Sequence, residues 1–142
     1  MFTRTCLLLL ALAPFAAAAQ SDPTGRWKTI DDETGRAKSI VEIRRLDDGS
    51  LSGRVVEILQ SDRGPNPTCE RCSGANKDKP IQGMTILWGL RPDGENAWSG
   101  GTILDPAKGR TYRSKAQLIA PDRLGVSGCV AFICREQVWQ RE

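Results

Sequence analysis

The cysteines are the residues of this chain whose spacing points most directly to chemistry. Cys69 and Cys72 form a Cys-x-x-Cys motif, and Cys129 and Cys134 enclose a short link, residues 130–133. A redox Cys-x-x-Cys usually opens a helix, whose N-terminus lowers the pKa of the thiol. Here the motif lies in a segment with several prolines and no strand-to-helix pattern, so the sequence favours a structural disulfide over a thiol redox centre.

We expect two local disulfides, Cys69–Cys72 and Cys129–Cys134. A hairpin about residues 130–133 would bring the second pair opposite each other. Pairing across the clusters would close a longer loop and contribute about 4 rather than about 2 kcal/mol, so proximity and not stability favours the local pairs. The four cysteines match a four-thiolate zinc site in number, but the second pair lacks the spacing of a metal knuckle, and we expect no metal.

The remaining side chains exclude most enzyme classes. The chain has no histidine, which removes Ser-His and Cys-His nucleophile pairs and the usual general base near neutral pH. Glu42 and Glu57 lie in expected strands, where a buried carboxylate pair could exchange protons, but we place both on solvent faces. No glycine-rich phosphate loop is present. We therefore expect no enzyme, no catalytic residue and no cofactor.

The tryptophans are the second unusual feature, because each lies in a different expected strand. Tryptophans so distributed can fill a core or line an aromatic pocket. Strand alternation puts Met84, Ile86 and Trp88 on one face, and a hairpin about Asp93-Gly94 would bring the next tryptophan near Trp88. The tryptophans are Trp27, Trp88, Trp98 and Trp139.

This face is the candidate ligand pocket, and no charge interrupts it. An uncharged or amphipathic guest therefore fits it better than a sugar phosphate, and a tyrosine in a neighbouring strand could orient the head group of the guest. In the alternative arrangement these side chains meet in the middle and leave no room. The candidate pocket residues are Met84, Ile86, Trp88, Trp98 and Tyr112.

The elements that must position these residues are short strands separated by turn signals. Clusters of Asp, Gly, Pro and Ser recur along the chain, and no window shows the period of a long amphipathic helix. The segment 60–81, with the first cysteine pair, is expected to be a loop. The expected strands cover residues 24–30, 38–46, 51–59, 82–90, 97–104, 110–119, 124–130 and 133–141.

Sequential hairpins of this kind predict an all-β antiparallel meander. A meander of about eight strands removes its exposed edges by closing into a single up-and-down barrel. We therefore expect such a barrel, with a β-sandwich as the second choice.

The first 19 residues have the pattern of a signal peptide. Arg4 precedes the apolar run 6–19, which is shorter than the roughly 20 residues that span a bilayer, and Ala17-Ala18-Ala19 suits cleavage before Gln20. Cys6 would leave with this segment. We expect one domain, residues 20–142, in the periplasm or outside the cell, with no integral membrane segment after cleavage. The weak positive charge is no sign of nucleic-acid binding.

Several segments together resemble a bacterial family known as domain of unknown function 2147. They are Gly25–Asp32, Cys69–Gly74, Gly83–Leu90, Trp98–Tyr112 and Gln137–Arg141. Val138 stands where the family usually has Thr. The resemblance implies an exported, lipocalin-like barrel with no established reaction.

Gly25-x-Trp27 also resembles the Gly-x-Trp motif of lipocalins. That resemblance implies that Trp27 plugs one end of the barrel beneath a basic side chain from the last strand, either Arg141 or, as second choice, Arg135. This role would be structural. For function we expect a carrier of a small apolar or amphipathic molecule. The alternative is a ligand-free envelope or stress-related interaction protein with a filled barrel and an unknown protein partner.

Overall fold

The computed structural model describes Met1, Pro14 and residues 22–142. The expected signal peptide and its cleavage site lie outside the described residues, apart from Met1 and Pro14. Eight strands and one short 3-10 turn make up the described chain. They are β1 (Gly25–Ile30), β2 (Ala37–Arg45), β3 (Leu51–Ile58), η1 (Gly74–Asn76), β4 (Thr85–Pro92), β5 (Ala97–Asp105), β6 (Arg110–Ala120), β7 (Arg123–Val130) and β8 (Ile133–Arg141).

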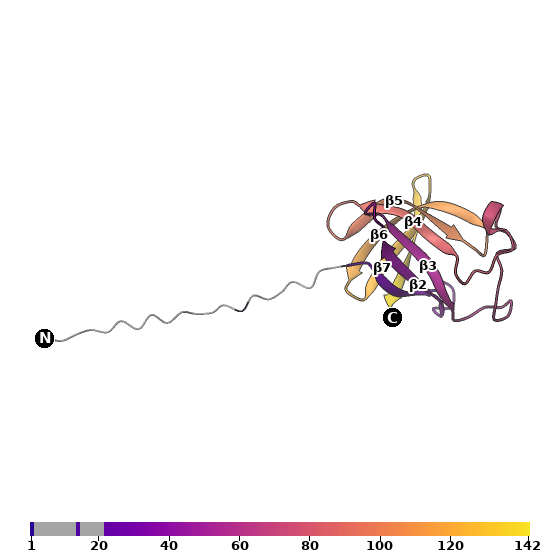
Figure 1. The fold of residues 1–142 in the computed structure, drawn as a ribbon, viewed down its shortest axis with the longest axis horizontal. Coiled ribbons are helices and arrows are strands. Elements are labelled where there is room, and N and C mark those ends of the chain that lie inside the picture. The colour runs from indigo at the N-terminus through magenta and orange to yellow at the C-terminus, as the bar shows by residue number, and fades with distance from the viewer. Residues whose placement is uncertain (2–13, 15–21) are drawn as a thin grey trace.

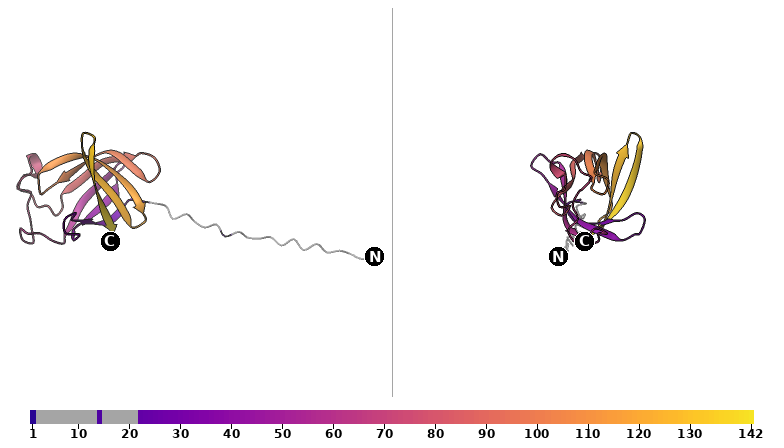
Figure 2. Two further views of the ribbon diagram at one scale, coloured as in Figure 1. Left: turned by 180° about the vertical axis from the view of Figure 1, so that it is seen from behind. Right: turned by 90° about the vertical axis from the view of Figure 1, so that its right-hand side faces the viewer.

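These strands form one closed antiparallel barrel in chain order, with β8 returning to β1 (Figures 1 and 2). The predicted all-β up-and-down barrel is therefore confirmed. The closing seam is short, because β1 and β8 pair only at Trp27 with Arg141 and at Lys28 with Gln140. No helix in the described part of the chain has the length and apolar character that crossing a membrane requires.

The two ends of the barrel differ, and we name them for what closes each. The plug end carries the turns at residues 46–50, 93–96 and 121–122, together with the start of β1 and the end of β8. The loop end carries the turns at 31–36, 106–109 and 131–132 and the long connection at 59–84.

Strand alternation decides what faces the interior. In β6, Ser114, Ala116 and Leu118 are buried, while the intervening Lys115 and Gln117 are exposed. This period of two is the pattern of a strand with one face on a core. The interior of the plug end is packed with apolar side chains that are at most 7% exposed, among them Trp27, Val41, Ile43, Leu51, Leu90, Trp98, Leu118, Leu124 and Trp139.

Strand β4 departs from this alternation. Leu87 pairs with Gly53 and Thr85 pairs with Arg54, so Ile86 is an extra residue between two successive partners on β3. A bulge of this kind breaks the two-residue period. Ile86 and Leu87 are consequently both buried, and Trp88 is turned out of the barrel.

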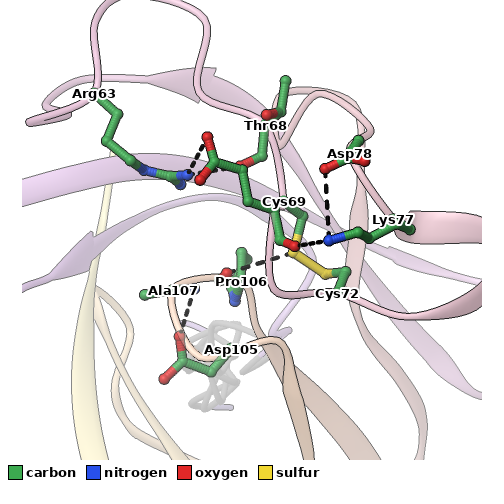
Figure 3. The surroundings of a disulfide bond; sticks show 10 residues. Arg63, Thr68, Cys69, Cys72, Lys77, Asp78, Asp105, Pro106 and Ala107 are labelled. Atoms are coloured by element: carbon green, nitrogen blue, oxygen red, sulfur yellow. Dashed lines mark hydrogen bonds and ion pairs between the residues drawn. A yellow bond between two sulfur atoms is a disulfide. The ribbon is translucent and has the colours of Figure 1, made fainter.

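The 59–84 connection packs on the loop end through the first disulfide. Cys69 and Cys72 are bonded and buried, and Cys69 Sγ lies 3.4 Å from the carbonyl oxygen of Pro106 in the β5–β6 turn (Figure 3). Gly109 in that turn has a φ of 64°, and a Cβ there would collide with the Arg71 carbonyl. The connection therefore lies directly against the turn and is fixed there.

Candidate functional site

The plug end is closed by Trp27 and Arg141. Trp27 is fully buried and donates its indole N–H to the Pro23 carbonyl at 2.9 Å. The Arg141 guanidinium lies 4.2 Å from the centroid of the Trp27 ring. Gly25 has a φ of 117°, and a Cβ at this position would lie only 3.0 Å from Arg141 Nη1. Glycine therefore leaves room for the guanidinium. A cation over an indole face is favourable by about 0.5–2 kcal/mol.

Arg141 also joins the segment before β1 to the end of β8. It donates hydrogen bonds to the carbonyl oxygens of Asp22, Thr24 and Pro121, each at 2.8–2.9 Å. Arg135, the second choice for the contact with Trp27, lies instead at the loop end, 3.2 Å from Asp32. The structure thus places Arg141 over Trp27, and the contact is one of packing and closure.

The residues of the expected ligand pocket do not form one wall. Met84, Ile86 and Trp98 are buried in the core at 6%, 7% and 7% exposure. Trp88 faces outward with 37% exposure. The expectation that Trp88 faces inward beside Trp98 was therefore wrong, because the β4 bulge shifts its side chain to the other face. In the β4–β5 ladder Trp88 lies opposite Thr102 and Trp98 lies opposite Pro92.

Trp88 instead borders an open hollow on the outer face of the barrel. This hollow has a volume of about 580 Å³ and is lined by side chains that include Arg54, Lys79, Gln82 and Met84. A second hollow adjoins it and shares Arg54 and Gln82. Both are shallow surface features with charged and amide side chains in their walls, and both lie outside the barrel interior.

Several inward-facing residues near the loop end are more exposed than those that fill the plug end. Residues paired directly across antiparallel strands share a face, and Ile103 pairs with Tyr112 while Ser114 pairs with Gly128. Ile103, Tyr112 and Gly128 therefore all face inward, yet all are only half-buried. A Cβ on Gly128 would lie 3.4 Å from Tyr112 and 3.5 Å from Ile103, in ordinary contact with both, so Gly128 lies directly beside these two side chains.

Polar groups accompany these apolar side chains at the loop end. Val126 pairs with Gln137, which faces inward and whose amide oxygen accepts a hydrogen bond from Trp139 Nε1 at 2.9 Å. The hydroxyls of Thr29 and Ser39 lie 2.7 Å apart. The loop-end interior is therefore amphipathic, with an apolar wall and several hydrogen-bonding groups.

Of these residues, sequence reasoning identified only Tyr112. The alternation of Leu124 and Val126 continues to Gly128, which would have placed this glycine on the inner face. Gln137 shares this signal with Trp139 in β8, whereas the irregular pairing of β5 hides it for Ile103. For the candidate pocket the alternation was read only in β4, where a bulge interrupts it.

Several exposed carboxyl groups have lowered pKa values because hydrogen-bond donors surround them. The Ser50 hydroxyl and backbone N–H, with Arg91 close by, hold the pKa of Asp48 below its usual range. The backbone and hydroxyl of Thr34 do the same for the pKa of Asp31. Both groups lie in turns, and their role is to order the backbone there. Among the described residues no three potential metal ligands of the His, Cys, Asp or Glu type lie together.

The second cysteine pair lies at disulfide distance on the β7–β8 hairpin. Cys129 and Cys134 face each other across the two strands with their Cα atoms 4.0 Å apart. Together with Cys69 and Cys72 this gives the local pairing expected from the sequence. The residues beyond this disulfide form the tip of the hairpin.

A closed eight-stranded antiparallel barrel, with a buried Gly-x-Trp tryptophan beneath an arginine of its last strand, is a lipocalin-like fold. The chain belongs to the bacterial family DUF2147, described as an uncharacterized protein conserved in bacteria, whose model matches residues 25–141.

A solved structure supports the fold assignment. Protein HP1028 from the human pathogen Helicobacter pylori, described as belonging to the lipocalin family, superposes with a TM-score of 0.73 at 15% identity. The match covers 85% of this chain and 83% of that one. At this identity the similarity is one of fold. None of the curated proteins compared matches this chain.

Proposed function

We propose that this protein is an exported, non-catalytic barrel that binds a small apolar or amphipathic molecule at its loop end. The observation that carries the proposal is the half-burial of Ile103 and Tyr112 beside Gly128, within a barrel whose plug end is tightly packed. Eight-stranded barrels of this size either fill with their own side chains or hold one small ligand.

The side chains at the loop end indicate what kind of molecule could bind there. Ile103 and the ring of Tyr112 offer an apolar wall, while the phenol hydroxyl and the Gln137 amide offer hydrogen bonds to a polar head group. Leu87, which pairs with Ile103, is fully buried beside this wall, and Trp98 is buried nearer the plug end, so a long chain would not fit. The guest is therefore a short amphipathic molecule.

Export is part of the same proposal. Residues 1–19 act as a cleaved signal peptide, and residues 20–142 fold in the periplasm or outside the cell. The two cysteine pairs at disulfide distance support this assignment, because structural disulfides persist in oxidising compartments.

A ligand-free interaction protein is the second candidate. The packed core that runs from Trp27 to Leu124 favours it, since a barrel filled by its own side chains acts through its surface. The two candidates differ in whether the loop end takes up a guest.

Ligand binding by the protein purified from cells that express the full chain separates the two. Native mass spectrometry would show a retained guest, and displacement of an environment-sensitive apolar dye by short fatty acids would measure affinity. Gly128→Leu should weaken binding about tenfold or more, because the new side chain fills the space of several methylene groups beside Tyr112.

Trp88→Ala is the matched control, because Trp88 lies on the outer face and its loss should leave binding unchanged. Urea unfolding would show that both variants are folded. Binding that resists Gly128→Leu would contradict the proposed site, and no saturable binding across the panel would support the second candidate.

A further inference from the structure

The tip of the β7–β8 hairpin exposes three apolar side chains. Val130, Phe132 and Ile133 have exposures of 64%, 101% and 79%. The hairpin projects beyond the rest of the barrel, as the yellow strands in Figures 1 and 2 show. Contiguous apolar surface on a protein commonly marks a site of interaction, whereas single apolar residues do not.

The tip is held in shape by its surroundings. The Cys129–Cys134 disulfide lies directly below it, and Val130 pairs with Ile133 across the turn. Ala131 has a positive φ of 51°, and its carbonyl oxygen accepts a hydrogen bond from Arg113 at 3.2 Å. Because the turn is already ordered, it loses little conformational entropy when its apolar side chains become buried against another surface.

We propose that this tip inserts into the surface of a lipid bilayer that carries anionic head groups. The tip is apolar, and two arginines lie just below it: Arg113 on β6, which donates to the Ala131 carbonyl, and Arg135 on β8, which is exposed and ion-paired with Asp32. Apolar side chains beneath a cationic collar match acyl chains beneath anionic phosphates. The tip spans only a turn, so it anchors at the interface.

The backbone of the tip is suited to a medium poor in water. Unpaired N–H and C=O groups are costly in hydrocarbon. Val130 and Ile133 pair with each other, and Arg113 bonds the Ala131 carbonyl. A second copy of the chain is a poorer occupant, because the two surface hollows described above both have Arg54 and Gln82 in their walls, a polar lining for an apolar tip.

Flotation with vesicles tests the proposal. The protein should float with vesicles of phosphatidylglycerol and phosphatidylcholine in equal parts and much less with phosphatidylcholine alone. Phe132→Ser combined with Ile133→Ser should lower the partition coefficient about tenfold or more, given the apolar area removed. Ile119→Ser, at an exposed apolar residue (45%) near the plug end and away from the tip, is the control and should change nothing.

Several outcomes would overturn the proposal. One is flotation of the tip variant equal to that of wild type, and another is equal loss in the Ile119→Ser control. Loss of self-association in the tip variant, without loss of vesicle binding, would assign the tip to a second copy. Gly128→Leu should float normally, so failure of ligand binding and failure of membrane binding remain distinguishable.

Discussion

Trp27 shows how one side chain closes an end of the barrel. Its ring is fully buried, its N–H is bonded to Pro23, and Arg141 covers its outer face. Replacing Trp27 by a small residue would therefore remove core packing, the hydrogen bond to Pro23 and the contact with Arg141 together. This convergence makes Trp27 the residue on which closure of the plug end depends most.

Trp27→Ala should lower the free energy of unfolding by about 3–5 kcal/mol, the range for truncation of a buried tryptophan. Equilibrium urea unfolding measures the change. Trp88→Ala, at an outward-facing tryptophan, should cost much less. A loss below about 1 kcal/mol for Trp27→Ala would remove the plug assignment.

Acidic turn residues predict how stability depends on pH. The lowered pKa values of Asp31 and Asp48 mean that each stabilises the fold while ionised, above its unfolded pKa, and that this stabilisation is lost as the pH falls through the lower folded pKa. The chain has no histidine, the residue that ordinarily titrates between pH 5 and 8.

The urea midpoint should therefore change little from pH 8 to 5 and fall below about pH 4. Asp48→Asn should lower the midpoint at pH 7 and make the acid decline shallower. Asp93→Asn serves as the comparison, since the Asp93 carboxylate has no hydrogen-bond partner among the described residues. An acid decline that is the same in Asp48→Asn as in wild type would argue against this role.

At the scale of elements, the contact between the 59–84 connection and the β5–β6 turn depends on one glycine. Gly109 has a positive φ and a Cβ there would collide with the Arg71 carbonyl. Gly94, in the β4–β5 turn, also has a positive φ of 86°, but a Cβ there would meet nothing within 4 Å. Comparing an alanine substitution at each glycine therefore separates the cost of backbone strain from the cost of collision with Arg71.

Gly94→Ala should cost about 1–2 kcal/mol from strain alone. Gly109→Ala should cost about 1–3 kcal/mol more, because the connection must shift away from the turn. Urea unfolding of both variants, compared with wild type, gives the difference. An equal loss of unfolding free energy in the two variants would mean that the contact between the turn and Arg71 contributes little to stability.

The strands were predictable because their signals are local. Turn residues mark the ends of each strand, and β6 alternates cleanly from Ser114 to Leu118. Strand β4 was harder, since the pairing of Leu87 with Gly53 shifts Trp88 to the other face. Glycine at residue 89, within a strand, was the available sign of irregular pairing. Register across strands is set by partners far along the chain, which no local pattern reveals.

At the scale of the whole molecule, the two ends of the barrel have different roles. The plug end holds the buried tryptophans and both ends of the described barrel, and its packing supplies stability. The loop end holds the half-buried interior residues, the disulfide-bonded connection and the apolar tip. The proposed ligand site and the proposed membrane contact both lie there, so a guest released from a bilayer would have a short path to Tyr112.

The pairing of β1 with β8 also determines when the barrel can close during folding. Trp27 lies in β1, the first strand of the ring, and Arg141, which covers it, lies in β8, the last strand. Hairpins between neighbouring strands can form as soon as both strands are made, but the ring waits for its last strand, because contacts of such long sequence separation form late. A chain whose last strand has not yet paired is therefore an open sheet with two bare edges, and only the pairing of β8 with β1 lets it close.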